Sequence, residues 1–155
     1  MNEALEMAKK AFDEGEIPVG AVIFKGTKII AKAQNSVEKD KDCTCHAEIN
    51  AIKKACNLLN TKILEECEMY VTVEPCAMCA GAIINARIKR LYIGTMEPKT
   101  GCFGSKIDLS KKGLFNHNVE VYYGFSEDEC KSLMQNFFKN KRKKGSIINV
   151  GVSNK

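Results

Sequence analysis

The sequence predicts an α/β protein in which one mixed sheet of five strands is covered by helices. Helix-like and strand-like segments follow one another in the order α-β-β-α-β-α-β-β-α, the pattern of a single sheet with helices packed on it. A strand–helix–strand unit at residues 69–93 predicts a right-handed parallel crossover, and a hairpin at residues 18–33 predicts an antiparallel pair. The chain of 155 residues is long enough for one domain with its own core.

The first half of the chain reads as a helix, a hairpin and a second helix. Leu5, Ala8 and Ala11 recur at helical spacing, and Gly15 is a typical residue just beyond a helix end. The turn signal around Gly26 separates two β-prone runs and so predicts the hairpin. The expected elements are a helix at 3–14, strands at 18–25 and 28–33, a loop at 35–42 and a helix at 46–58.

The second half reads as three strands and two helices. Pro75 predicts a helix start because proline suits the first helical turn. Ser126 and Glu129 form a capping-box pattern, which predicts the start of the final helix. The expected elements are strands at 69–73, 91–93 and 119–123, helices at 75–87 and from 126 towards 142, and a glycine-rich loop at 99–105.

Basic residues concentrate at the C-terminal end. From Lys139 onward there are six Lys or Arg residues and no acidic residue, which leaves 18 basic and 19 acidic residues before it. Residues 1–138 are therefore nearly neutral. We expect a domain at residues 1–142 and a basic, disordered tail at 143–155. The basic stretch is consistent with a solvated helix end and equally with contact to a polyanion such as RNA.

The chain shows no sign of export or membrane insertion. Its first residues are too acidic and too polar for a signal peptide, and no apolar run approaches the ~20 residues of a membrane span. We expect a cytoplasmic protein. In that reducing compartment the eight cysteines are expected to be thiols, most of them small packing residues.

Two of the cysteines have the spacing of metal ligands. Cys76 and Cys79 are three residues apart in a predicted first helical turn, where free amides and the helix dipole favour thiolate. His46 lies at the start of another predicted helix. If the two helix starts meet at one edge of the sheet, one imidazole and two thiolates form a set that suits zinc.

Glu48 favours a catalytic zinc site over a structural one. A structural site is closed by four protein ligands, whereas a catalytic site keeps one position for water. The fourth ligand could be water or a spare cysteine. Two residues after His46, the Glu48 carboxylate is placed to move the proton of an activated water without binding the metal.

The joint pattern His46-Ala-Glu48 and Pro75-Cys-Ala-Met-Cys79 is typical of zinc-dependent nucleobase deaminases. From about residue 4 to 142 the chain resembles the bacterial tRNA-specific adenosine deaminases. The resemblance implies a three-layer α/β/α sandwich like that of cytidine deaminase, a homodimer, and conversion of adenosine to inosine at the wobble position of an arginine tRNA. The matching stretches are Pro18–Val22, His46–Ile49, Tyr70–Ala82, Lys99–Gly101, Gly104–Ser105, Asn116–His117 and Phe137–Phe138.

The same resemblance implies roles for individual residues. One zinc ion per subunit is bound by His46, Cys76 and Cys79, and Glu48 is the catalytic acid and base. Asn35 contacts the target nucleoside, and the amide of Ala47 helps to hold the base. Contacts to the anticodon stem-loop are expected from Glu97, Lys99, Lys106, Phe138, Lys139, Lys141 and Arg142.

Some residues depart from the family pattern or stand beside the motif. Glu97 occupies a position where aspartate is common. Cys43 and Cys45 precede His46 and could compete for metal, although packing is the favoured interpretation. His117 is expected to brace a loop rather than bind metal.

Three other functions compete with this hypothesis. A deaminase of another substrate, such as guanine, free cytidine or a deoxynucleotide, would use identical zinc chemistry. The basic C-terminal end and the Lys99-Thr-Gly101 loop argue for RNA instead. A zinc-stabilised RNA-binding module without activity would have no use for Glu48. A redox protein using Cys76 and Cys79 would leave His46 and Glu48 unexplained.

Overall fold

The computed structural model describes residues 1–152 of the chain, and the side chains of residues 1–145. It contains the predicted mixed sheet of five strands, in the order β2-β1-β3-β4-β5. β1 pairs antiparallel with both β2 and β3, whereas β3, β4 and β5 run parallel. The hairpin and the parallel strand–helix–strand unit are therefore both confirmed. The strands are β1 (Gly20–Lys25), β2 (Lys28–Gln34), β3 (Cys67–Val73), β4 (Arg90–Thr95) and β5 (Glu120–Tyr122).

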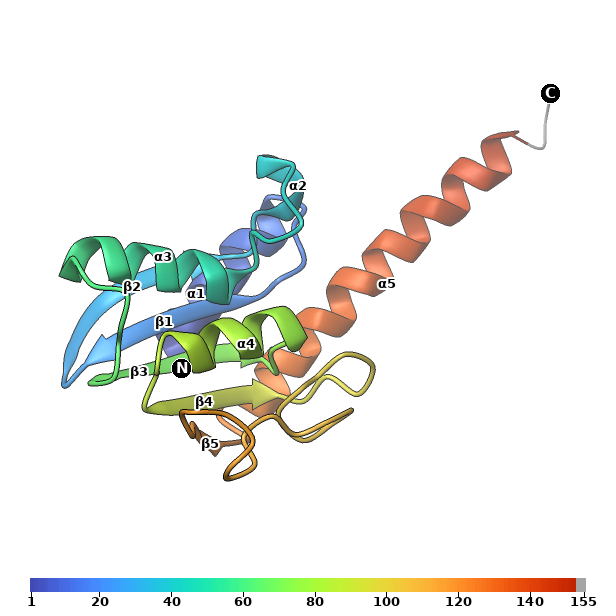
Figure 1. The fold of residues 1–155 in the computed structure, drawn as a ribbon. Coiled ribbons are helices and arrows are strands. Elements are labelled where there is room, and N and C mark those ends of the chain that lie inside the picture. Colours follow the sequence, from blue (N-terminus) through green and yellow to red (C-terminus); the bar gives the residue numbers. More distant parts are fainter. Residues whose placement is uncertain (153–155) are drawn as a thin grey trace.

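Helices cover both faces of the sheet and complete the three layers (Figure 1). α3 and α4 lie on one face, and α1 and α5 lie on the other. A single helical turn, α2, lies within the segment that we expected to be a loop. The helices are α1 (Asn2–Asp13), α2 (Val37–Asp40), α3 (Ala47–Leu59), α4 (Ala77–Asn85) and α5 (Glu127–Val152).

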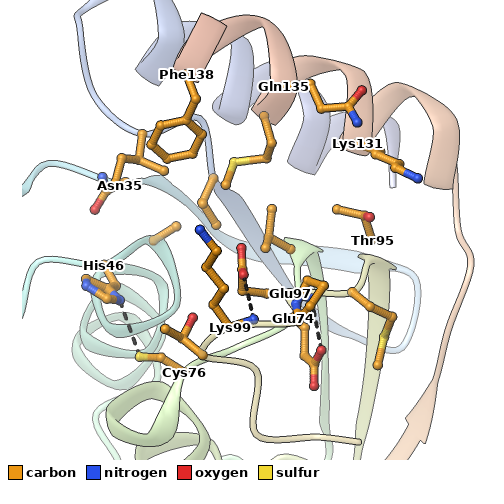
Figure 2. Close-up of a pocket in the computed structure, with 18 of the residues that line it drawn as sticks. Asn35, His46, Glu74, Cys76, Thr95, Glu97, Lys99, Lys131, Gln135 and Phe138 are labelled. Atoms are coloured by element: carbon orange, nitrogen blue, oxygen red, sulfur yellow. Dashed lines mark hydrogen bonds between the residues drawn. The ribbon is translucent and has the colours of Figure 1, made fainter. Parts of the chain in front are cut away.

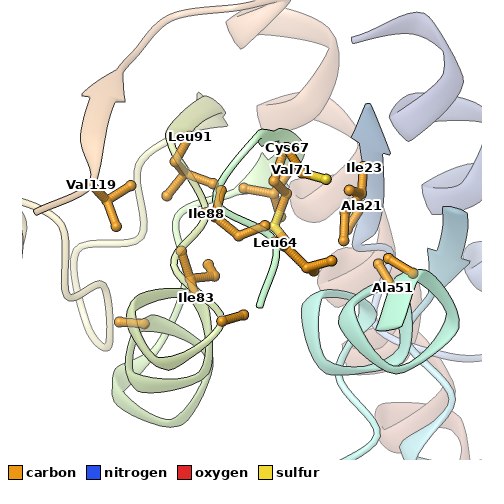
Figure 3. Packing of buried hydrophobic residues seen from close by; sticks show 14 of the residues in the cluster. Ala21, Ile23, Ala51, Leu64, Cys67, Val71, Ile83, Ile88, Leu91 and Val119 are labelled. Atoms are coloured by element: carbon orange, nitrogen blue, oxygen red, sulfur yellow. The ribbon is translucent and has the colours of Figure 1, made fainter. Parts of the chain in front are cut away.

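The main core lies between the sheet and the α3–α4 layer (Figure 3). Ile83 of α4 and Ala51 of α3 face buried strand residues such as Ile23 and Val71, and all four side chains are fully buried. Alanines at the buried positions of α3 let this helix approach the sheet closely, which fixes where its N-terminus lies.

On the other face, α1 packs directly against the backbone of β1. A Cβ atom at Gly20 would lie 2.0 Å from the carbonyl oxygen of Ala4. The glycine is therefore required by this close approach and not by a turn. The absence of a side chain at Gly20 lets α1 lie directly against β1.

Three local predictions differ from the structure. α4 begins at Ala77, so Pro75 precedes the N-cap residue Cys76 and does not stand in the first turn. Pro75 instead joins two loops, because its carbonyl accepts a hydrogen bond from the amide of Cys102. The capping box at Ser126 is wrong: Ser126 adopts a left-handed backbone with φ of 52°, and no described hydrogen bond involves its side chain.

α5 is also longer than expected. It continues past Arg142 to Val152, although only Lys143 and Lys144 in that stretch are strong helix formers. Figure 1 shows this end of α5 projecting away from the sheet. The division into a domain at 1–142 and a disordered tail at 143–155 stays a prediction, and residues 153–155 lie outside the described part. Within that part, no helix combines the length and the apolar character that crossing a membrane requires.

Candidate functional site

The first component of the site is the start of α3. His46 is the N-cap residue of this helix, with extended backbone angles (φ −70°, ψ 154°). Ala47 and Glu48 follow in the first turn, where the backbone amides have no partner within the helix. Asn50 fixes this start to the end of β2, because its side-chain amide donates to the carbonyl oxygen of Gln34 and to the hydroxyl of Ser36.

The second component is the start of α4. Cys76 is the N-cap residue, and Cys79 lies one turn further along the helix, fully buried. β3 delivers the chain to this point through Glu74 and Pro75. The two helix N-termini meet at the same edge of the sheet, which is the condition that the zinc hypothesis requires.

The three predicted ligands converge (Figure 2). The Nδ1 atom of His46 lies 3.6 Å from Sγ of Cys76 and 3.4 Å from Sγ of Cys79. Tetrahedral zinc with ordinary Zn–N and Zn–S bonds requires ligand atoms about 3.5 Å apart. In the described part of the chain, His46, Cys76 and Cys79 form the group of side chains able to hold a metal ion. The donor set and its spacing fit zinc and leave one position of a tetrahedron without a protein ligand.

Hydrogen bonds within this group favour a thiolate at Cys76. The neighbouring Cys79 thiol, helped by His46, lowers the pKa of Cys76 to about 4. The same contact, together with burial, raises the pKa of Cys79. The hydrogen bond with Cys76 also raises the pKa of His46. These contacts therefore favour the thiolate form of Cys76, which is the form that binds a metal cation.

Glu48 is a buried carboxyl group beside these ligands. It is 3% exposed, and burial raises its pKa above the ordinary value for a glutamate. It interacts with Cys79 and His46 but is outside the group whose atoms converge as metal ligands. A carboxyl group with a raised pKa is suited to taking up and releasing protons near neutral pH.

The site opens into a pocket of about 760 Å³. His46, Ala47, Glu48 and Cys76 form its base, and the segment 95–100 forms one wall. Figure 2 shows α5 passing over the opposite side, with the ring of Phe138 directed into the space. The volume is in the range of pockets that hold small-molecule ligands, and it exceeds what a single base needs.

Most of the residues predicted from the sequence line this pocket, and others lie outside it. The lining includes Asn35, Ala47, Glu48, Glu97, Lys99, Phe138 and Arg142. Lys106, Lys139 and Lys141 are exposed and are not part of the lining. The two adjacent phenylalanines divide as expected, because Phe137 packs edge-on against Phe12 of α1 whereas Phe138 faces the pocket.

Sequence reasoning missed two parts of the pocket. One is the face of α5 formed by Lys131, Met134 and Gln135. With Phe138 and Arg142 these residues follow helical i, i+3, i+4 spacing, which was visible in the sequence. The other is Glu74, a buried carboxyl group on the link between β3 and α4.

The remaining cysteines and the second histidine are separate from the site. Cys43 is exposed and Cys45 is buried, and neither belongs to the converging ligand group. The burial of Cys45 supports the packing interpretation. His117 donates from Nε2 to the carbonyl oxygen of Ile88 at 2.7 Å, so it braces a loop as predicted.

Comparison with known proteins points to one family. A family model described as MafB19-like deaminase matches residues 1–142. The chain is 43% identical to the tRNA-specific adenosine deaminase of Bacillus subtilis (strain 168) over 153 residues, covering 99% of this chain and 95% of that protein. It is 47% identical to the tRNA-specific adenosine deaminase of Aquifex aeolicus (strain VF5), covering 90% and 91%. A solved structure from a study of A-to-I editing by tRNA:A34 deaminases at the wobble position of transfer RNA has a TM-score of 0.83 and 39% identity, covering 86% of this chain and 96% of that one.

Proposed function

The chain belongs to the family of tRNA-specific adenosine deaminases, and on this premise we propose that its pocket hydrolyses the wobble adenosine of an arginine tRNA to inosine. The observation that carries this proposal is the convergence of His46, Cys76 and Cys79 beside the buried carboxyl group of Glu48. Three ligands and a separate proton carrier are the components of hydrolytic deamination.

We propose that His46, Cys76 and Cys79 hold one zinc ion per chain. The imidazole–thiolate donor set and the 3.4–3.6 Å spacing support zinc over harder cations, which prefer oxygen ligands. When bound, zinc would supply a Lewis acid that makes water nucleophilic at neutral pH.

Glu48 is proposed to be the residue that moves protons. Its carboxylate accepts one proton from the attacking water and delivers it to N1 of adenine. It then takes the remaining proton from the hydroxyl formed at C6 and passes it to the amine, which leaves as ammonia. Its burial beside the converging ligand group supports this role, and burial also raises its pKa, which favours uptake of a proton.

Asn35 and Ala47 are proposed to hold the target nucleoside. Asn35 is 5% exposed and lines the pocket, so its amide has a fixed position from which to bind ribose or base. Ala47 occupies the first position of α3, where its backbone amide points out of the helix and can donate to the base.

We propose that the wall and rim of the pocket contact the anticodon loop. Lys99 and Arg142 supply charge and Phe138 supplies a ring on which an unstacked base can lie, while Glu97 shapes the same wall. Lys106, Lys139 and Lys141 are exposed on neighbouring segments and are proposed to contact phosphates.

Replacing Lys139 and Lys141 together with alanine tests the phosphate contacts. We expect weaker binding of an anticodon stem-loop, and a slope of log Kd against log salt that is shallower by about 1.4 to 1.8, because two phosphate contacts are lost. Fluorescence anisotropy over a salt series measures this. A double Lys28→Ala/Lys62→Ala variant is the matched control, since both lysines are exposed at the opposite end of the sheet. An unchanged slope in the first variant would exclude these two lysines from the RNA interface.

A panel of substrates tests the proposed function itself. The zinc-loaded protein is incubated with an arginine anticodon stem-loop carrying adenosine at the wobble position, and in parallel with free adenosine, cytidine and guanine. We expect inosine from the stem-loop alone, because a hairpin loop presents an unstacked base together with the phosphates that the rim contacts. Faster conversion of guanine or cytidine would make the chain a deaminase of small substrates. No product from any substrate would favour a non-catalytic RNA-binding or redox role.

We also propose a homodimer in the cytoplasm. α4 contains no charged residue, and its partly exposed positions include Met78, Gly81 and Ala82. Small, uncharged residues on an exposed helix face support packing against a second copy of the chain.

A further inference from the structure

Glu74 is a buried carboxyl group that the mechanism above does not use. It is 3% exposed and stands on the link between β3 and the ligand Cys76. Its Oε1 atom accepts hydrogen bonds from the amide of Glu97 at 3.0 Å and from the hydroxyl of Ser105. Its Oε2 atom accepts from the amides of Phe103 at 3.0 Å and Ser105 at 3.1 Å. One side chain thus binds both ends of the segment 97–105.

The segment folds tightly around this carboxylate. A Cβ atom at Gly101 would lie 2.3 Å from Cδ of Glu74, so only glycine leaves room for the side chain. The amide of Gly101 donates to the carbonyl oxygen of Glu97 at 2.9 Å, and the amide of Cys102 donates to that of Pro75 at 2.9 Å. Because residues 97–102 form no helix or strand, these bonds and the Glu74 carboxylate determine their path.

The part of this segment that faces the pocket carries Glu97 and Lys99. The carboxylate of Glu97 accepts a hydrogen bond from the amide of Lys99 at 3.0 Å, so a chain of bonds connects Glu74 to the backbone of Lys99. Figure 2 shows the Lys99 side chain extending from this wall into the middle of the pocket. The direction of that ammonium group depends on how the wall is anchored.

We propose that Glu74 is a positioning residue that fixes the pocket wall so that Lys99 meets a phosphate of the bound RNA. This inference rests on the proposed function and extends it, because it names the residue that positions the segment proposed to contact the RNA. Glu74 itself touches neither the base nor the reacting atoms. It acts through the backbone of 97–105, and it joins that wall to the strand–helix link that carries Cys76.

A double-mutant cycle on the zinc-loaded protein tests the proposal. Kd for the anticodon stem-loop is measured for wild type, Glu74→Gln, Lys99→Ala and the double variant. We expect Glu74→Gln to raise Kd and KM by about tenfold, because an amide NH₂ would face backbone donors, while kcat changes by less than about threefold. In the Lys99→Ala background the same replacement should change Kd by less than about threefold, because the two residues act on one contact. Equal effects in both backgrounds, or an unchanged Kd, would overturn the proposal.

Glu16→Gln is the matched control for this cycle. Glu16 is also a buried carboxyl group that accepts two backbone amides, from Glu38 and Lys39, but it holds α2 and is not part of the pocket lining. Whatever its effect on Kd, that effect should be the same with and without Lys99. If the effect of Glu16→Gln on Kd also shrank in the Lys99→Ala background, as expected for Glu74→Gln, the coupling would reflect a general loss of stability. That result would overturn the positioning role of Glu74.

A further measurement separates this proposal from the proposed function. Amide hydrogen exchange needs no substrate, and we expect the amides of Glu97, Phe103 and Ser105 to exchange faster in Glu74→Gln than in wild type or in Glu16→Gln. Ser105→Ala is a second variant, for use if Glu74→Gln folds poorly. It removes the hydroxyl that donates to Glu74 and leaves the buried carboxyl group in place. We expect it to raise Kd by about twofold. Unchanged exchange at these amides would overturn the anchoring role. Absence of deamination by the wild type would overturn the proposed function, whereas the binding cycle and the exchange rates decide the role of Glu74.

Discussion

Glu48→Gln is expected to lower kcat for wobble adenosine by roughly 10²–10⁴-fold, the usual contribution of a positioned proton carrier. Glutamine keeps the shape of the side chain but cannot take up or deliver a proton. The zinc content and the Kd for the stem-loop should stay at the wild-type level, because Glu48 is outside the converging ligand group. Single-turnover kinetics with the stem-loop, together with metal analysis of the same sample, measure both effects.

The stability of this variant is a second part of the prediction. Burial raises the pKa of Glu48, so its ionised form is disfavoured in the folded protein. Removing the charge should therefore leave the melting temperature unchanged or raise it. Glu65→Gln, an exposed glutamate remote from the site, is the control and should retain full activity. Substantial activity in Glu48→Gln would assign the proton transfer to another group.

Cys79→Ser is expected to remove both the metal and the activity. Cys79 is fully buried, and its Sγ atom lies 3.4 Å from Nδ1 of His46. A serine hydroxyl is a much poorer ligand than a thiolate for zinc, so we expect bound zinc to fall well below about one per chain and kcat/KM to fall at least about 100-fold. Elemental analysis after gel filtration measures the metal, and the stem-loop assay measures the activity.

Cys67→Ser separates this effect from the cost of placing a hydroxyl in the core. Cys67 is 1% exposed, in β3, and lies outside the ligand group. Its replacement should lower the melting temperature but leave a full complement of zinc. Equal zinc loss in both variants would mean that Cys79 acts through folding and not through coordination.

The converging group of His46, Cys76 and Cys79 and the neighbouring Glu48 were predictable because each half of the site is local in sequence. His46 and Glu48 share one helix start, and Cys76 and Cys79 share another, so residue spacing alone indicates their chemistry. Their meeting at one edge of the sheet was only a condition of the hypothesis, because it depends on how the two helices pack in the fold. Pro75 lies two residues before the helix start, and its carbonyl accepts a hydrogen bond from the amide of Cys102 in a distant loop, a contact that the local sequence does not indicate.

The parts that were missed depend on contacts between distant segments. Glu74 is separated by more than twenty residues from the amides of Glu97, Phe103 and Ser105 that it binds. No periodic pattern in the sequence indicates that one carboxylate accepts hydrogen bonds from such a distant loop. The pocket face of α5 has helical spacing, yet Lys131 and Gln135 read equally well as a solvent-exposed face. Such a face becomes a pocket wall only where the helix crosses the open edge of the sheet (Figure 2).

Position-resolved deamination in water labelled with heavy oxygen tests the central claim most directly. The zinc-loaded protein is incubated with an arginine anticodon stem-loop that contains adenosine at the wobble position and at other positions, and the product is sequenced by mass spectrometry. We predict inosine at the wobble position alone, with one labelled oxygen at C6, and none with Glu48→Gln. Inosine without label, inosine at other positions to the same extent, or no inosine would contradict the assignment of this pocket as a hydrolytic wobble-adenosine deaminase site.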